Sequence, residues 1–455
     1  MEAPKPLKKE NVLLTGSITK GLLSLGIPVV GSLLLQTTFN IVDTIWIGRL
    51  GDTALAAIST AGFVIWSIFA LTGVVSVGVT AMVARFVGAD DQRMAGQVAG
   101  QGIWLGVLTS VGISTGGFLS AWHIFAFMGT AADVTTLGLS YLNVMFWGMP
   151  SLVLFFVLNA IYRGNGDTKT PMVLLLIAVL INGALDPFLI FGWGPFPELG
   201  VAGAAYATVI ARAVGVVLGI VILLRREGWI HWLAPNGRRI DLSIMRRILR
   251  IGIPASIAGL AVTVIYIFLT RVTTRFGTSA VAALGAGHKV QSITYMVGVG
   301  TSAAVTTMVG QNLGAGQPER AERTAWIGCI IIAAFNGVMA VIYLTLSPAI
   351  IRIFINDPDV IRVGAAYLKF IAIAEVFMGI ESVLDGAFSG AGDTLPPTII
   401  SVPLTIARYP LAHYFAMVLW NHINGVWFAI AITGFIRGIL IMYWFRRGKW
   451  KEKEV

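Results

Sequence analysis

The stretch GIPVVGSLLLQTTFNIVDTIWIG, residues 26–48, is almost entirely apolar but carries one acidic residue, Asp43. A helix of this length crosses a bilayer core of roughly 30 Å. Pro28 removes a backbone hydrogen bond, so we expect a hinge near the start of the helix. At about 100° per residue, Gln36, Asn40 and Asp43 share one face. Polar groups at bilayer depth are costly, so this face should line a cavity or another helix. The alternative role for Asp43 is an interhelical hydrogen bond.

Similar apolar runs recur along the whole chain. Of its 455 residues, 56 % are hydrophobic and 12 % charged, whereas soluble domains are roughly a quarter charged. The runs are continuous rather than alternating, which favours helices over barrel strands. The connections are too short for a catalytic domain, which excludes a soluble enzyme. We expect an all-α integral membrane protein with twelve spans, at 22–48, 54–84, 95–121, 136–161, 171–193, 201–224, 251–274, 280–309, 325–350, 365–388, 396–420 and 426–445.

The basic residues are unevenly distributed. Most of the 32 Lys and Arg residues precede the first run or lie in alternate connections, in the connection 225–250 and in the tail after 445. The positive-inside rule predicts cytoplasmic termini in a multi-pass protein of the cell membrane. The net charge of +10 is thus expected to reflect topology rather than nucleic-acid binding. No cleavage site follows the basic start, so the first run should be retained. The single cysteine, Cys329, predicts no disulfide framework.

The two halves of the chain are related by an internal repeat at an offset of 226 residues. The pattern around Gly26 and Pro28 returns at Gly252 and Pro254, and GNGDT at 164–168 returns as GAGDT at 390–394. After one deletion, Thr208 and Arg212 match Thr433 and Arg437. This predicts six-helix bundles at 1–224 and 251–455 joined by a cytoplasmic linker at 225–250. Because each half has an even number of spans, both bundles cross the membrane in the same orientation. They should be related by a pseudo-twofold axis along the membrane normal. A static channel or scaffold is the alternative.

A second intramembrane acid lies in the fifth run. Asn182 and Asp186 are four residues apart on one face, and their positions in the second half hold no carboxylate: Ala412 replaces Asp186, and Leu269 replaces Asp43. Two aspartates on different helices suggest a titrating pair suited to proton exchange. Carboxylate and amide oxygens in this set are also suitable Na⁺ ligands. The structural alternative is that Asp186 caps a helix break caused by the following proline. No Walker-type phosphate loop is present, so the energy should come from an ion gradient or another subunit.

The second half has its own intramembrane charges. Ion pairing among them and a substrate-facing polar wall are both open. These candidates are Lys289, Glu375, Glu381, Asp385 and Arg408. We expect Arg212 and Arg437 to bind backbone carbonyls near helix breaks. The repeated Gly-x-Gly-Asp is typical of helix caps at loops, because proline follows in or near the first turn.

These residues resemble the multidrug and toxic compound extrusion (MATE) family, especially its DinF-like archaeal and bacterial branch. The resemblance covers nearly the whole chain and is most specific in TTFNIVDTIWIGRLG, residues 37–51, and NGALDPFLIFG, residues 182–192. It implies that Asp43 and Asp186, with Asn182, form a proton- or cation-responsive centre, which we extend to Asn40. Na⁺ is a second possible occupant of this centre.

The resemblance also implies a substrate cavity. Gln36, Tyr141 and Asn159 match cavity-facing positions, and we assign Phe39 to the same cavity because it flanks the polar stripe. Pro28 matches the helix-bending proline. Phe39 stands where relatives often have tyrosine, and Ala204 where some have threonine. The missing hydroxyls favour proton over Na⁺ coupling.

The expected function is antiport. A proton or Na⁺ would enter in exchange for amphipathic, often cationic, small molecules, with protonation of the aspartate pair rearranging the first helix. No cofactor, enzymatic activity or nucleic-acid partner is expected, and a monomer in the lipid bilayer is the default. The runner-up is a lipid-linked oligosaccharide or lipid flippase of the same superfamily.

Overall fold

A computed structural model describes residues 12–225 and 240–453, which are helical with short connections. The first half contains α1 (Val12–Thr15), α2 (Ile18–Gly48), α3 (Asp52–Gly88), α4 (Gln92–Met128), α5 (Ala132–Trp147), α6 (Met149–Gly164), α7 (Lys169–Phe191) and α8 (Val201–Arg225). The second half contains α9 (Leu242–Thr273), η2 (Thr274–Phe276), α10 (Thr278–Gly314), α11 (Pro318–Phe354), α12 (Pro358–Ala391), α13 (Leu395–His413), η3 (Tyr414–Leu419), α14 (Asn424–Arg446) and η4 (Lys449–Glu452).

Most of the expected spans are single long helices. Among the described residues, ten helices are long and apolar enough to cross a membrane. The run expected as one span at 136–161 is instead the bent pair α5 and α6, which meet at 55° and make an eleventh. The pair breaks at Gly148, where a Cβ atom would overlap Val209 of α8. Residues 396–420 lie in α13 and the π-helical η3, and prolines and Arg408 make this segment less apolar.

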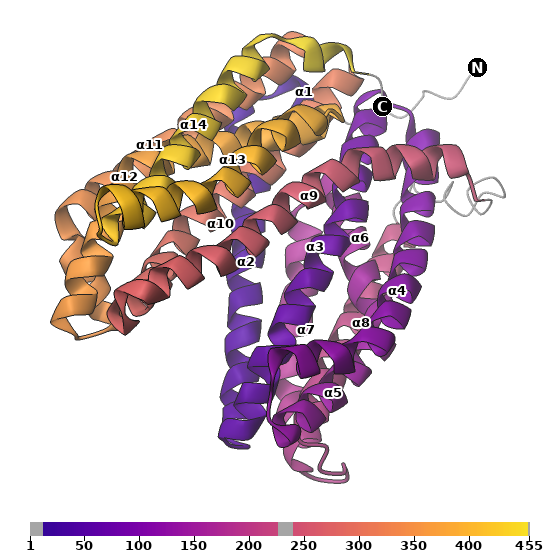
Figure 1. Ribbon diagram of the computed structural model, residues 1–455. Coiled ribbons are helices and arrows are strands. Elements are labelled where there is room, and N and C mark those ends of the chain that lie inside the picture. Colours follow the sequence, from indigo (N-terminus) through magenta and orange to yellow (C-terminus); the bar gives the residue numbers. More distant parts are fainter. Residues whose placement is uncertain (1–11, 226–239, 454–455) are drawn as a thin grey trace, which may run out of the picture.

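The two halves form two lobes arranged as a V (Figure 1). They meet at the end that carries α1 and the carboxyl end of α14, which we call the terminal end. They diverge toward the opposite end, which we call the splayed end, where the α4–α5 and α11–α12 turns lie on separate arms. The helices of the two lobes are therefore farthest apart at the splayed end.

Helix α2 belongs to both lobes. Leu22 and Leu25 pack into the core of the second half, whereas Phe39 and Ile47 pack into the core of the first. Pro28 lies between these two groups, inside the continuous helix. A bend at this proline would change the position of the second part of α2 relative to the first.

Helix α9 repeats this crossing in the opposite direction. Ile248 and Ile251 pack into the core of the first half, Ile265 and Leu269 pack into the core of the second, and Pro254 lies between. The first helix of each half therefore exchanges its amino-terminal part with the other lobe. α9 begins at Leu242, so the linker expected over 225–250 is too long. The helix starts early because Asp241 accepts hydrogen bonds from the amides of Ser243 and Ile244.

Equivalent contacts confirm that the sequence repeat is a structural duplication. The Thr80 hydroxyl donates to the Ala160 carbonyl at 3.2 Å, and the equivalent Thr306 hydroxyl donates to Gly386 at 2.9 Å. Gly166 and Gly392 both adopt positive φ, +86° and +77°, in the equivalent GDT loops. Positions that differ between the halves can therefore be compared directly.

Candidate ion-coupling site and lobe interface

The two aspartates of the first half lie together. Helix α2 packs against α7, and the Asp43 carboxyl interacts with the side chains of Asp186, Asn182 and Thr208. Asn182 Nδ2 donates to Asp186 Oδ1 at 3.3 Å, and both residues are fully buried. Three helices, α2, α7 and α8, thus bring four polar side chains into one cluster, which we call the aspartate site.

The aspartate site has unused acceptor atoms. Asp43 Oδ1, Asp186 Oδ2, Asn182 Oδ1 and Thr208 Oγ1 are buried and have no hydrogen-bond partner. Buried polar atoms are usually paired, so each such atom calls for an explanation. Four oxygens around two adjacent carboxylates are suited to receive a proton or a cation, which would offset the repulsion between them.

The nearest cation does not neutralise this site by direct contact. Arg212 of α8 acts on Asp43 electrostatically, but its Nη2 atom donates to Gln36 Oε1 at 2.6 Å. Its guanidinium lies over the rings of Phe39 and Phe155, 5.1 and 4.7 Å from their centroids. We expected Arg212 to bind backbone carbonyls, and this was wrong. It is fixed by an amide and two aromatic rings.

The other residues singled out in the first half surround the aspartate site unevenly. Gln36 donates to Asn40 at 3.3 Å, and Asn40 is exposed. Tyr141 is largely buried near both aspartates, and Asn159 is buried with Oδ1 unpaired. Phe39 is only 3 % exposed and belongs to the core of the first half. Its ring packs beneath Arg212, and its expected role as a cavity residue stays a prediction.

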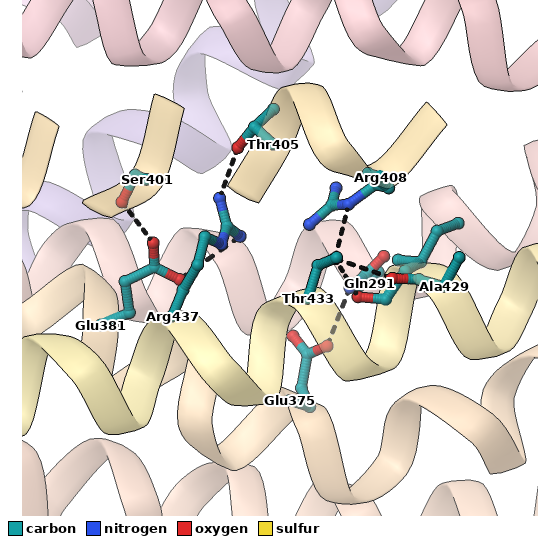
Figure 2. A network of polar contacts seen from close by, with 10 residues as sticks. Gln291, Glu375, Glu381, Ser401, Thr405, Arg408, Ala429, Thr433 and Arg437 are labelled. Carbon is teal, nitrogen blue, oxygen red and sulfur yellow. Dashed lines mark hydrogen bonds and ion pairs between the residues drawn. The ribbon is translucent and has the colours of Figure 1, made fainter. Parts of the chain in front are cut away.

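The second half contains a different polar network (Figure 2). Glu381 forms a buried ion pair with Arg437, with Nη2 3.3 Å from Oε2, and accepts a hydrogen bond from Ser401 at 2.9 Å. Arg437 Nη1 also donates to Thr405 Oγ1 at 2.9 Å. The expectation that Arg437 binds carbonyls was wrong as well, since its partners are side chains.

Of the five second-half candidates, Glu381 is the one with a direct ion pair among the described residues. Glu375 accepts from Gln291 at 2.9 Å and from Thr294, which are neutral donors. Arg408 Nε donates to Thr433 at 3.0 Å, and its Nη2 atom has no partner. The remaining two are Asp385, with an unpaired buried Oδ1 atom, and Lys289, which is exposed.

One member of the aspartate site, Thr208, was not among the candidate site residues chosen from the sequence. It appeared only as a repeated position shared with Thr433, and the neighbouring Arg212 was expected to have a structural role. Repetition suggested an architectural role, but it also marked the helix face that points into the centre of each lobe. Ala204, which was aligned with a threonine of some relatives, is buried one turn before Thr208 on α8. A hydroxyl is therefore available beside Asp43.

The lobes are joined at the terminal end. Thr307 and Gln311 of α10 donate to the carbonyls of Arg163 and Gly164 in the first half, each at 3.0 Å. Arg85 of α3 donates to the Lys453 carbonyl at 3.1 Å, linking the first lobe to the carboxy-terminal tail. These hydrogen bonds close the terminal end.

The two GDT loops serve different purposes at this end. Asp167 caps α7, as expected, by accepting from the amides of Lys169 and Thr170. Asp393 pairs instead with Lys453, at 3.3 Å. The position equivalent to Thr170 is Pro396, which has no amide hydrogen to donate.

The MatE family model matches residues 28–188 and 254–414, once in each half. A probable multidrug resistance protein NorM of Thermotoga maritima is 31 % identical over 99 % of this chain and 96 % of its own. An FAD transporter of Shewanella oneidensis is 28 % identical, with 96 % of each chain covered. A MATE crystal structure in the straight conformation has a TM-score of 0.88 and 25 % identity, covering 97 % of this chain and 99 % of that one. The chain therefore belongs to the MatE family of multidrug efflux transporters, with two lobes of membrane-spanning helices, and it is a transporter rather than an enzyme.

Proposed function

We propose that the protein is a proton-driven antiporter of the cell membrane that exports amphipathic organic compounds. The aspartate site supports this proposal most strongly, because two interacting carboxylates retain unpaired buried oxygens and no direct cation contact. A proton shared between Asp43 and Asp186 would satisfy this arrangement. Proton uptake and release would then change the contacts that fix the second part of α2.

The orientation follows from charge. Basic residues cluster in the connections and tail at the terminal end, so this end is cytoplasmic under the positive-inside rule. The conformation described above would then be open to the outside and closed to the cytoplasm. A related multidrug resistance MATE transporter has been solved in an outward-facing conformation, with 25 % identity and a TM-score of 0.88.

Helix α2 is the element through which the site would act. Its first part is packed on the second half and its second part carries Asp43, with Pro28 between them. Related crystal structures capture a MATE protein in a straight and in a bent conformation. Bending of α2 at Pro28 when Asp43 and Asp186 exchange a proton would connect the ion site to the space between the lobes.

A proton is favoured over Na⁺ as the coupling ion. Two adjacent buried carboxylates that repel each other can share a single proton. Na⁺ would have to be held by the oxygens of Asp43, Asp186, Asn182 and Thr208 alone. One elementary charge crossing 100 mV provides roughly 2.3 kcal/mol, or about a fifty-fold concentration ratio.

The test is ethidium export from proteoliposomes under separately imposed gradients. A pH gradient without Na⁺ should drive accumulation, and a Na⁺ gradient at equal pH should not. Accumulation with Na⁺ alone would assign the site to Na⁺. Accumulation with neither gradient would contradict ion coupling altogether.

A flavin nucleotide is the second candidate substrate. The S. oneidensis relative covers nearly this whole chain and is named an FAD transporter. Export of FAD from loaded proteoliposomes, compared with ethidium under the same pH gradient, distinguishes the two substrate classes.

A further inference from the structure

One face of α10 contacts the first lobe from Gly300 onward. Thr307 and Gln311 on this face donate to the carbonyls of Arg163 and Gly164. Gly300 lies on the same face and is packed closely on α2, where a Cβ atom would stand 3.1 Å from the Gly26 carbonyl oxygen. At about 100° per residue, Lys289 falls within roughly 20° of Gly300 and Thr307. Lys289 therefore lies on the lobe-facing side of α10.

Lys289 is exposed although it lies well inside a membrane-spanning helix. Its ammonium group forms no ion pair or hydrogen bond with any residue that the structure describes. A lipid-facing ammonium at this depth would be costly. Its place on the same face as Gly300 and Thr307 indicates that it faces the space between the two lobes rather than lipid.

The opposite wall of this space is polar. Lys289 precedes Gly300 by three turns, or about 16 Å along α10. The same displacement along α2 from Gly26 reaches the stretch between Thr37 and Asn40, whose two ends are exposed. Lys289 thus contributes a positive charge to a wall that faces uncharged hydrogen-bonding groups.

The repeat shows that this charge is specific to one lobe. The position equivalent to Lys289 is Phe63 of α3, which is 63 % exposed. The two equivalent positions therefore present an aromatic ring from one lobe and a lysine from the other. This combination suits a flat aromatic molecule that carries an anionic group.

We propose that Lys289 is a specificity-determining residue that binds an anionic group, carboxylate or phosphate, on amphipathic aromatic substrates. The inference rests on the proposed export function and adds the chemical class of the substrate. It differs from the expectation of predominantly cationic substrates, because an unpaired ammonium attracts anions and repels cations across the same cavity.

The test compares matched compounds that differ in one anionic group. Riboflavin and flavin mononucleotide share a ring system and differ by a phosphate. A free-acid rhodamine dye and its methyl ester differ by a carboxylate. Binding of each compound to the purified protein is measured by fluorescence titration, and each is also used to compete with ethidium export in proteoliposomes.

In the wild type, each anionic member should bind roughly tenfold more tightly than its neutral or esterified partner. Lys289→Met should remove this preference, and Lys289→Arg should retain it. If Lys289→Met removes the preference in only one pair of compounds, the anionic group of that pair, phosphate or carboxylate, is the one that Lys289 binds. Because Lys289 is exposed, both variants should fold.

Equal binding of both members of each pair by the wild type would overturn the proposal. An unchanged preference for the anionic compounds in Lys289→Met would also overturn it. So would a Lys289→Met variant that alters the pH response of ethidium export but keeps this preference. Failure of the wild type to export ethidium, with the binding preference intact, would count against the export function alone.

Discussion

The two lobes have equivalent helices, but the arginine at the equivalent position has different partners in each lobe. In the second half, Arg437 pairs directly with Glu381. In the first half, the equivalent Arg212 lies over Phe155, which occupies the position of Glu381, and the acids stand elsewhere, at Asp43 and Asp186.

This difference distinguishes a carboxylate that is held in an ion pair from carboxylates that can exchange a proton or a cation. Glu381 has two donors in contact, whereas one oxygen of each aspartate in the first half is buried without a donor. An ion-paired carboxylate has little need of a proton, but an unpaired one does. Ion exchange is therefore expected at the aspartate site and structural stabilisation at Glu381, whereas Asp385 of the second half also keeps an unpaired buried oxygen.

The largest effect should come from breaking the ion pair. Arg437→Met would leave Glu381 buried without its cation, which should lower the free energy of unfolding by about 3–5 kcal/mol. Arg212→Met is the matched variant and should cost about 1–2 kcal/mol, since Arg212 contacts only an amide and aromatic rings. Thermal melting of both variants in detergent, at one scan rate, measures the difference. Equal losses would contradict the distinction between the lobes.

The next effect concerns coupling rather than stability. Asp43→Asn should abolish concentrative ethidium export and leave downhill leakage, a loss of up to about fifty-fold in the gradient that one proton sustains at 100 mV. Glu381→Gln should keep the response to a pH gradient, because Glu381 does not exchange protons. Efflux from proteoliposomes at matched protein content reports both. Wild-type accumulation by Asp43→Asn would remove the aspartate site from the mechanism.

A smaller effect on stability should distinguish α2 from α9, the two helices that pass from one lobe to the other. A Cβ atom on Gly252 of α9 would overlap the Val74 carbonyl, whereas one on Gly26 of α2 would stand 3.4 Å from the Gly300 carbonyl oxygen. Gly252→Ala should therefore lower stability by about 1–3 kcal/mol, and Gly26→Ala by less than about 1 kcal/mol. Comparable melting temperatures for the two variants would show that both crossings tolerate the same movement.

The smallest effect should arise at the terminal end. Lys453 pairs with Asp393 at a partly exposed site, so Lys453→Ala should change stability by no more than about 1 kcal/mol. Its side-chain ion pair is lost, while its carbonyl still accepts from Arg85. Arg85→Ala removes that link between the lobes and should make the terminal end easier to open. Cross-linking of cysteines placed across the terminal end would detect this change as a slower reaction.

Much of the fold follows from the sequence. Apolar runs located the helices, and the offset of 226 residues places Thr80 opposite Thr306, which make equivalent contacts in the structure. The break at Gly148 was not predicted, although Pro150 in the first turn of α6 is a signal for a helix start. The close approach of Val209 from α8 to Gly148 depends on how the helices pack.

The candidate site was predicted less completely. The positions of Asp43 and Asp186 on polar helix faces indicated a pair, and the structure brings them together. The partners of Arg212 were missed because Gln36 is 176 residues away along the chain. Phe39 was assigned to the cavity because it flanks the polar stripe, but Arg212 covers its ring. Long-range partners of this kind depend on how the helices pack.

The most direct test of the central claim is substrate-driven proton movement. Proteoliposomes containing a trapped pH-sensitive dye are given ethidium, and proton flux is recorded for the wild type, Asp43→Asn, Asp186→Asn and Glu381→Gln. Wild type and Glu381→Gln should move protons in exchange for ethidium, and both aspartate variants should not. Proton exchange that survives both aspartate substitutions but is lost in Glu381→Gln would place ion coupling in the second lobe and contradict the account.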